Sequence, residues 1–474
     1  MFTSSHHQQQ GSRRKFIGQA CCSAVGSTAL FSTLLNLRMA NTAAAQSVPA
    51  GSDYKALVCL FFAGGCDSYN MLLPYGDAEY AEYAAIRGDL ALSKANGEIL
   101  PLLLNQSIGK DLGIHSGMPE IQALCNAGNA AWIANVGTLV QPTTKEQYQA
   151  ESVILPLGLS PHADQIRQWQ TSVPQDTSSV GWGGRTADLL HSLNNNENIS
   201  MNISIAGNNT WQPGNEVFEY VVSPGGSTGR SRYEETWGVN PAMSSAIDSQ
   251  LTHDYQNLFV NTFAKKGKGA MDAHAEFSSA IDESAALETA FPKDNYLADQ
   301  LRMVAQTIQA RSALGMNRQT FFVQVGGWDH HDEVLGTMGT MLPAVSQAVD
   351  AFYSALAEIN AQDNVTLFTA SDFGRTLTSN GAGSDHAWGG NHLIVGGAVN
   401  GGQVYGTYPD LYEGNLQDTG RGRLIPTTSV DAYFGELALW FGVSPQDLPT
   451  VLPNVTNFYT PTAAGGPLGF MNLS

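Results

Sequence analysis

Three apolar segments of strand length constrain the fold of this chain most strongly, because an aspartate follows each of them. The segments span residues 55–62, 321–325 and 365–369. Asp67 follows the first, Asp329 the second and Asp372 the third. Strands that are apolar on both faces are typical of a parallel sheet covered by helices. Such strands end at one edge of the sheet, where open α/β sheets bind ligands. The pattern therefore predicts three carboxylates at that edge.

Helical periodicity completes the pattern. Residues 296–314 and 341–359 carry apolar side chains at intervals of three and four, as amphipathic helices do. Apolar runs at residues 130–137 and 393–397 add further strands. Because strands and helices alternate, we predict the α/β class, with a mostly parallel sheet flanked by helices on both faces.

The N-terminus has the three regions of a signal peptide in their usual order. Ser12-Arg13-Arg14-Lys15-Phe16-Ile17 matches a twin-arginine export motif, a weakly apolar stretch follows, and small residues stand at Ala43-Ala44-Ala45. We therefore expect residues 1–45 to be a cleaved twin-arginine signal peptide. The partner in export would be the twin-arginine translocase, and the expected location is periplasmic or extracellular.

The rest of the chain, residues 46–474, is expected to form a single domain. A stretch near residues 207–250 is rich in Gly, Ser, Asn and Pro, and we expect a loop-rich insertion there. No segment after the signal peptide approaches the ~20 apolar residues of a membrane span. The mature chain is therefore expected to have no membrane span.

Charge limits the partners of the mature chain. The whole sequence has 23 basic and 42 acidic residues, and residues 1–45 hold four of the basic ones and no acid. The mature chain thus has a net charge near −23, with 19 basic against 42 acidic residues. Such a surface opposes nucleic acid and anionic membrane surfaces.

Histidines gather in the same region as the strand-end aspartates. Four of the 11 histidines lie in residues 321–392, each beside an acid or a glycine turn. Imidazole and carboxylate groups are ligands for divalent metal ions. The candidate ligands are Asp67, Asp329, His331, Asp372, His386 and His392. Such a set suffices for two ions about 3.5–4 Å apart. His330 and His331 are adjacent and point to opposite sides of an extended segment, so we prefer His331, on the side of Asp329.

Several ordered motifs resemble a known family. The motifs are Gly64-Gly65-Cys66-Asp67, Pro161-His162, Gly181-Trp182-Gly183-Gly184-Arg185, Gly326 to His331, Ser371 to Arg375, Ser384 to Gly389, Gly396-Gly397-Ala398-Val399, Gly401-Gly402 and Tyr405-Gly406. Together they resemble the bacterial exported proteins grouped as "domain of unknown function 1501". That family is similar to the alkaline phosphatase and sulfatase superfamily. The resemblance covers most of the mature chain and implies an alkaline phosphatase-like core.

The resemblance also implies a distribution of ligands between two divalent ions. One ion would take Asp329, His331 and either His386 or His392, and the other would take Asp67 and Asp372. The sequence does not distinguish zinc, calcium, magnesium and manganese. In many superfamily members a histidine follows the acid at the position of Asp372, whereas this chain has Phe373. That difference weakens the second metal site.

The nucleophile is less clearly indicated. Sulfatases of the superfamily convert a cysteine in a Cys-x-Pro/Ala-x-Arg setting to formylglycine, and neither Cys59, Cys66 nor Cys125 has that setting. Related proteins usually show Ser-His-Phe near residue 162, where this chain has Ser160-Pro161-His162-Ala163. His162 is a candidate ligand, general base or phosphate-site residue. Ser160 is a candidate nucleophile or an ordinary loop serine.

Arg375 is a candidate for substrate binding, because a guanidinium group can hold an anion by two hydrogen bonds; the alternative is an ordinary salt bridge.

The leading hypothesis is an exported metal-dependent hydrolase of a phosphate or sulfate ester, acting on a small anionic substrate. The alternative is a non-catalytic exported protein that keeps the fold and serves binding or envelope assembly.

Overall fold

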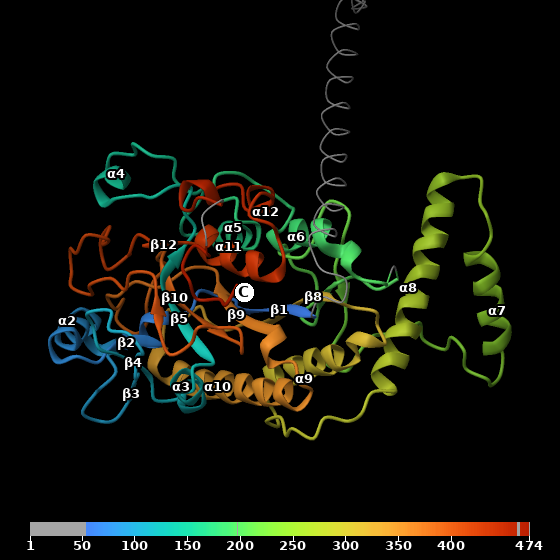
Figure 1. Cartoon of the computed structure of the whole chain (residues 1–474), viewed down its shortest axis with the longest axis horizontal. Helices are drawn as coiled ribbons and strands as arrows, with labels where there is room; N and C mark the ends of the chain where they lie inside the picture. Colours follow the sequence, from blue (N-terminus) through green and yellow to red (C-terminus); the bar gives the residue numbers. More distant parts are fainter. Residues whose placement is uncertain (1–53, 197, 462–464, 474) are drawn as a thin grey trace, which may run out of the picture.

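The structure is a computed structural model that describes residues 54–196, 198–461 and 465–473 (Figure 1). The expected signal peptide, residues 1–45, lies outside the described residues.

A mixed, mostly parallel sheet forms the centre of the fold (Figure 1). Its strands are β1 (Lys55–Phe62), β5 (Ala130–Gly137), β6 (Asn202–Ser204), β7 (Tyr220–Val221), β8 (Arg318–Val325), β9 (Val365–Ser371), β10 (Gly390–Val395), β11 (Val404–Tyr405) and β12 (Thr428–Ser429). In the described part of the chain they run in the order β11-β5-β10-β9-β1-β8-β6-β7, and β12 pairs with β5. Among the described strands of this sheet, β10 alone pairs in antiparallel fashion, with β5 and β9. The predicted α/β class is confirmed.

Helices cover both faces of this sheet, as predicted (Figure 1). One face is covered by α3 (Pro119–Asn126), α9 (Tyr296–Gln309) and α10 (Val334–Glu358). The other is covered by α5 (His162–Thr171), α6 (Trp182–Leu190), α11 (Val430–Phe441) and α12 (Leu448–Val451). Strand β1 shows why both faces need cover. Its even-numbered residues from Ala56 to Phe62 join one buried apolar cluster, and its odd-numbered residues from Leu57 to Phe61 join the other.

The three central strands end level with one another, and this sets the position of the site. Phe62, at the end of β1, pairs with Val325 of β8 and with Ser371 of β9. Because all three strands are parallel, the loops that follow them leave the same edge of the sheet. The predicted meeting of the strand-end loops is therefore confirmed.

Smaller elements surround this core. They are α2 (Asp77–Arg87), α4 (Lys145–Gln149) and a second sheet of β2 (Leu72–Pro74), β3 (Ile99–Pro101) and β4 (Leu112–His115), in the order β2-β4-β3. Among the helices of the described ranges, none has the length and apolar character that crossing a membrane requires.

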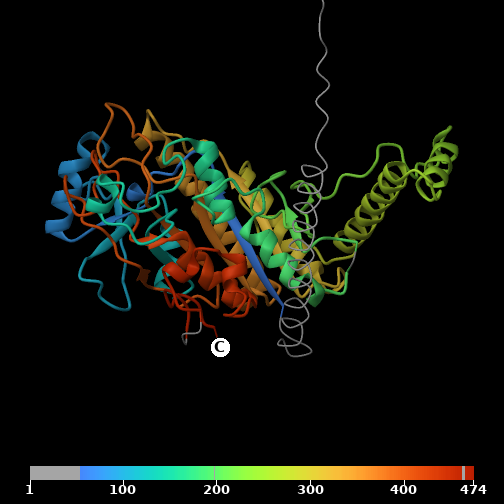
Figure 2. The ribbon, with the colours of Figure 1, turned by 90° about the horizontal axis from the view of Figure 1, so that it is seen from above.

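Two helices project from the body of the molecule. They are α7 (Asn240–Leu251) and α8 (Leu258–Asp282), and together they form a hairpin that stands to one side in both ribbon views (Figures 1 and 2). The insertion expected near residues 207–250 thus includes β7 and most of α7. The projecting part of the chain continues beyond it into α8.

Candidate metal centre

The loop after β1 makes room for the loop after β8. Gly64 has φ +120°, and a Cβ atom built on it would lie 2.6 Å from the backbone nitrogen of Asp329. A side chain at this position would therefore be strained and would also clash. The backbone nitrogen of Gly64 donates to Asp372 Oδ1 at 3.0 Å. Glycine here lets three strand-end loops pack within hydrogen-bonding distance.

Arg375 holds these loops together from the inside. Its side chain is fully buried, and its guanidinium donates to the backbone carbonyls of Gly65 (2.8 Å), Gly64 (2.6 Å), Ser384 (3.0 Å) and Trp328 (3.3 Å) and to Asp329 Oδ1. The expectation that Arg375 binds an anionic substrate is corrected. Its donors already serve five acceptors of the protein, and the group does not face solvent.

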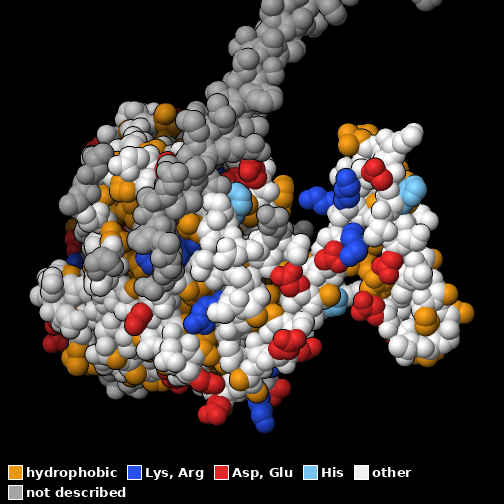
Figure 3. All heavy atoms as spheres, turned by 45° about the vertical axis from the view of Figure 1, so that its right-hand side comes forward, with side chains coloured by type: hydrophobic (Ala, Val, Ile, Leu, Met, Phe, Trp, Pro, Cys, Tyr) orange, Lys and Arg blue, Asp and Glu red, His pale blue; other side chains and the backbone are white. Residues whose placement is uncertain are grey.

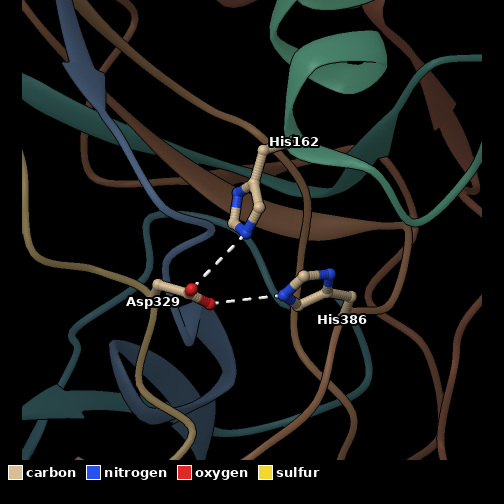
Figure 4. Close-up of side chains that lie close together, drawn as sticks. All are labelled: His162, Asp329 and His386. Atoms are coloured by element: carbon tan, nitrogen blue, oxygen red, sulfur yellow. Dashed lines mark hydrogen bonds and ion pairs between the residues drawn. The ribbon is translucent and has the colours of Figure 1, made fainter.

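Asp329 lies at the centre of the site, where three imidazoles approach its carboxylate. Figure 4 shows two of them, His162 and His386. His331 Nε2 is 3.1 Å and His386 Nε2 is 3.3 Å from Oδ1, and His162 Nε2 is 3.5 Å from Oδ2. Burial alone would raise the pKa of Asp329, but the hydrogen bond and charge of Arg375 hold it below its ordinary value. Asp329 is therefore a charged carboxylate, about half exposed, facing the three rings.

His386 reaches the site because its segment folds back on the end of β9. The backbone of Gly374 donates to the Trp388 carbonyl, and Arg375 forms an antiparallel bridge with His386. The His386 ring then lies with Nδ1 2.8 Å from the carbonyl of Ser160. A carbonyl oxygen only accepts, so Nδ1 carries the proton. Burial lowers the pKa of His386, which favours the neutral ring with a free Nε2 lone pair.

His162 is the first residue of α5 and is held from behind by a carboxylate. Its Nδ1 lies 2.7 Å from Asp372 Oδ2. Asp372 is almost completely buried, and burial raises its pKa. The aspartate that was expected as a metal ligand thus bonds to Gly64 and His162 through its two oxygens. This pairing directs His162 Nε2 outward, toward Asp329.

His331 is held in the same way by Asp385. Its Nδ1 is 3.3 Å from Asp385 Oδ1, and Arg421 binds the other oxygen of Asp385 at 2.6 Å. His331 Nε2 lies 3.0 Å from His386 Nε2. His330 is buried on the opposite side and packs against Trp328. The two neighbouring histidines therefore point apart, and the preference for His331 agrees with its position.

The donors fit a metal ion. His162, Asp329 and His386 can each present one ligand atom, all within 4.8 Å of one another. Asp329, His331 and His386 are separated by 3.0 to 3.3 Å. Ligands at about 2.0–2.1 Å from a tetrahedral ion would stand about 3.3 Å apart. In each ring, Nδ1 is bonded to an acceptor, the arrangement that orients histidine ligands in metal proteins.

Phe373 and Ser160 have roles other than those considered from the sequence. The Phe373 ring packs 4.3 Å from the His386 ring and 4.9 Å from the His162 ring, so it supports both imidazoles. Ser160 has an exposed side chain, and its contribution to the cluster is the backbone carbonyl that binds His386. The structure therefore gives no support to Ser160 as the nucleophile.

Asp67 does not face the cluster. It is fully buried, forms a 2.7 Å ion pair with Arg87, which is also fully buried, and accepts from Ser384 Oγ at 3.1 Å. The expectation of a second ion held by Asp67 and Asp372 is corrected, because a guanidinium already neutralises the first and Gly64 and His162 occupy the second. The described residues provide good donors for one ion.

His392 also lies outside the cluster. It is buried on the face of the sheet that α5 and α11 cover, with its ring 4.6 Å from the Trp169 ring and Nδ1 3.3 Å from Thr369 Oγ1. The expectation that it is a metal ligand is corrected. His392 belongs to β10, and its ring joins the packing beneath α5 and α11.

Two residues that bind the candidate site residues, Asp385 and Arg87, were not identified from the sequence. Asp385 directly precedes His386, so the Asp-His pair was visible, but nothing in the pattern assigned the acid to His331. Arg87 lies on α2, about twenty residues after Asp67, and no local signal links it to that acid. The three cysteines of the described chain, Cys59, Cys66 and Cys125, are buried and unpaired.

Comparison with known proteins identifies the family. Residues 54–420 match the family described as "Protein of unknown function (DUF1501)", and the chain belongs to this family. The resemblance noted in the sequence is thereby confirmed. A comparison with curated proteins finds no match.

Solved structures of several enzymes are similar to this chain. The PsFucS1 sulfatase from Pseudoalteromonas sp. is 12% identical, with 86% of this chain and 71% of that chain covered and a TM-score of 0.31. Alkaline phosphatase from the Antarctic bacterium TAB5 is 11% identical, with 74% and 95% covered and a TM-score of 0.27. The lipoteichoic acid synthase LtaP from Listeria monocytogenes is 9% identical, with 90% and 78% covered and a TM-score of 0.30. Similarities this low do not bear on activity.

The position of His392 predicts a pH dependence of stability. Burial lowers its pKa to about 3, whereas the unfolded chain protonates a histidine near its ordinary value of about 6.5. Between these values the unfolded state binds more protons, so stability falls as pH falls. From pH 7 to pH 5 this histidine should cost about 2 kcal/mol of unfolding free energy. In denaturant unfolding, the His392→Gln variant should therefore lose about 2 kcal/mol less unfolding free energy between pH 7 and pH 5 than the parent loses.

The control is His253→Gln, at an exposed histidine of the hairpin. Its loss of stability between the two pH values should match that of the parent. Equal losses in the parent and in His392→Gln would contradict the buried neutral histidine.

Proposed function

We propose that Asp329, His331 and His386 bind one divalent metal ion and that the chain is a metal-dependent hydrolase of a phosphate or sulfate ester. One observation carries the proposal. His331 Nε2 and His386 Nε2 lie 3.0 Å apart while each Nδ1 is bonded to an oxygen acceptor. Two lone pairs at that distance repel each other unless a proton or a metal ion lies between them, and the adjacent Asp329 carboxylate makes a metal ion a suitable occupant. The Asp329 carboxylate supplies the third ligand and a negative charge.

The donor set favours a borderline ion such as zinc over calcium or magnesium, because two of the three ligands are imidazoles. Three protein ligands that leave an open position are typical of a catalytic zinc site. When bound, the ion would polarise an ester oxygen and lower the pKa of a bound water. The cluster is open to solvent, since Asp329 and His331 are each 46% exposed.

His162 is assigned the proton transfer. Asp372 accepts from its Nδ1, so its Nε2 lone pair faces the cluster and can take a proton from an attacking water. The water oxygen would bond to phosphorus or sulfur, and the bond to the ester oxygen would break. The protonated His162 would then return its proton to the departing alcohol. Asp372 holds the ring orientation throughout, as the buried carboxylate does in other acid–histidine pairs.

Arg421 replaces Arg375 as the candidate for an anionic group of the substrate. Its side chain is 44% exposed and pairs with Asp385 at the edge of the cluster. Unlike Arg375, this guanidinium remains accessible from solvent. An exposed group can bind a charged ester without the cost of breaking buried hydrogen bonds.

We also propose that residues 1–45 direct export through the twin-arginine translocase, which places the mature chain in the periplasm or outside the cell. The twin arginines, apolar stretch and alanine site support this. Export of an already folded chain suits a protein whose metal site is assembled from three separate loops.

The test is hydrolysis by purified full-length mature chain of chromogenic phosphate and sulfate esters, with zinc, manganese, magnesium or calcium added separately. We expect hydrolysis that a chelator abolishes and zinc restores. His386→Ala removes a proposed ligand. It should reduce activity by more than the roughly 10–100-fold loss that follows mutation of a residue hydrogen-bonded to a ligand. His253→Ala, on the projecting hairpin, should leave activity unchanged.

Hydrolysis that survives both chelation and His386→Ala would contradict a metal-dependent activity. A chain that binds no metal and hydrolyses none of the esters would favour the alternative, a non-catalytic exported protein that retains the fold.

A second prediction separates the roles of the two acid–histidine pairs. Asp372→Asn weakens the support of His162, the proposed base, and should lower kcat by about 100-fold or more with the metal content unchanged. Asp385→Asn weakens the support of His331, a proposed ligand, and should instead lower metal affinity by about 10–100-fold. Turnover and metal titration are measured on both variants.

The result that contradicts this division is loss of metal from Asp372→Asn or from His162→Ala. In that case His162 would be a ligand, and the proton would have to be taken by another group. A stability measurement on each variant controls for general unfolding.

A further inference from the structure

The projecting hairpin of α7 and α8 has almost no packing partner. In α7 only Asn240 and Ser244 are buried, and in the first half of α8 only Ala264 is buried. The hairpin stands clear of the body in two views at right angles (Figures 1 and 2). An element that buries so little of itself gains little stability from the fold that carries it.

The outer end of α8 is apolar over more than half of its circumference. Leu258, Phe259 and Phe263 are 73%, 84% and 78% exposed, and Val260 is also exposed. Successive helical residues are separated by about 100°, so Leu258, Phe259 and Val260 together span more than half of the circumference. A groove in a partner protein takes one helical stripe at intervals of three and four residues. A medium that surrounds the end of the hairpin would bury all of these side chains.

Three lysines follow this apolar end at a defined distance along the helix. Lys265, Lys266 and Lys268 lie six to nine residues beyond Phe259, a distance of about 9–14 Å along the helix. Figure 3 shows hydrophobic side chains at the outer end of the projection and Lys or Arg side chains below them. Amphipathic helices at membrane surfaces bury their apolar side chains about 5–10 Å deep, so the lysines would reach the headgroup level.

The first half of α8 is basic, although the complete chain has a net charge of −19. Residues 258–271 contain three lysines and no acid, and the nearest acids of the outer part of the hairpin are Asp254, in the loop before α8, and Asp248, on α7. Lys268 is paired with Asp272, whereas Lys265 and Lys266 are exposed at the surface. Charges interact over a Debye length of about 8 Å at physiological ionic strength. An anionic surface at the end of the hairpin therefore lies within reach of three lysines and of the single acid Asp254, and farther from the acidic body.

We propose that the outer end of the α7–α8 hairpin inserts into an anionic lipid surface, with Leu258, Phe259 and Phe263 in the acyl boundary and the lysines at the phosphate groups. The apolar end is wider than a single helical stripe, which favours lipid over a protein groove, and the lysines favour an anionic headgroup. The proposal is independent of the metal centre. It attaches the chain to a membrane surface without a membrane-spanning segment.

The test is co-sedimentation of the full-length mature chain with vesicles of phosphatidylcholine alone or with phosphatidylglycerol added. We expect binding to the phosphatidylglycerol vesicles that weakens at high salt. Phe259→Ser/Phe263→Ser should weaken binding at least about tenfold, because two large apolar groups no longer leave water. Lys265→Glu/Lys266→Glu should weaken it about tenfold or more.

Leu103→Ser is the matched control, since Leu103 is as exposed as the hairpin residues but lies on the body of the molecule. This variant should bind vesicles like the parent. All variants should keep the parent's unfolding temperature, because the changed side chains are exposed. Failure of the parent to bind phosphatidylglycerol vesicles would overturn the proposal, as would unchanged binding by the double Phe variant. A parent that binds no vesicles and forms a dimer that this variant dissociates would assign the surface to a second copy.

Discussion

The site depends on the buried guanidinium of Arg375. It donates to carbonyls of the loops after β1 and β8 and of the returning segment before His386, and it binds Asp329 directly. Loop carbonyls that converge at the end of a parallel sheet need donors, since water is excluded from them. One planar group with five N–H donors satisfies them and fixes the three loops relative to one another. The same charge keeps Asp329 ionised, so the residue that assembles the site also sets the charge of its central ligand.

A second layer of acceptors turns this scaffold into a set of ligands. Asp372, Asp385 and the Ser160 carbonyl each bind the Nδ1 of one histidine. Because Nδ1 is occupied, every ring presents Nε2 to the same carboxylate. The acceptors also differ between the rings: Asp372, which binds His162, is buried, whereas Asp385, which binds His331, is paired with the exposed Arg421. The proposal of His162 as the base and His331 as a ligand uses that difference. The hairpin proposed to bind lipid differs from the site in the groups that it uses, because its outer end exposes apolar side chains whereas the site is held together by buried polar groups.

The sequence predicted the strands and the edge of the site better than the roles of single residues. Apolar runs such as residues 55–62 and 130–137 became β1 and β5 with the same bounds, because a buried strand needs continuous apolar sequence. Asp329, His331 and His386, which the structure brings together, were named from the sequence because each adjoins a strand end or a turn. Asp67, His392 and Arg375 were misassigned, since their partners Arg87, Trp169 and the loop carbonyls are brought near only by tertiary packing. A pattern reports residue type and spacing, and it does not report which charges are already neutralised.

The most direct test of the account is the number and environment of metal ions in the purified chain. Elemental analysis with X-ray absorption on the zinc-loaded protein should give one ion per chain, bound by nitrogen and oxygen with imidazole scattering and without sulfur. The His386→Ala variant should lose that ion, while the His162→Ala variant keeps it. Two ions per chain, or one that persists in His386→Ala, would contradict a single centre built on Asp329, His331 and His386.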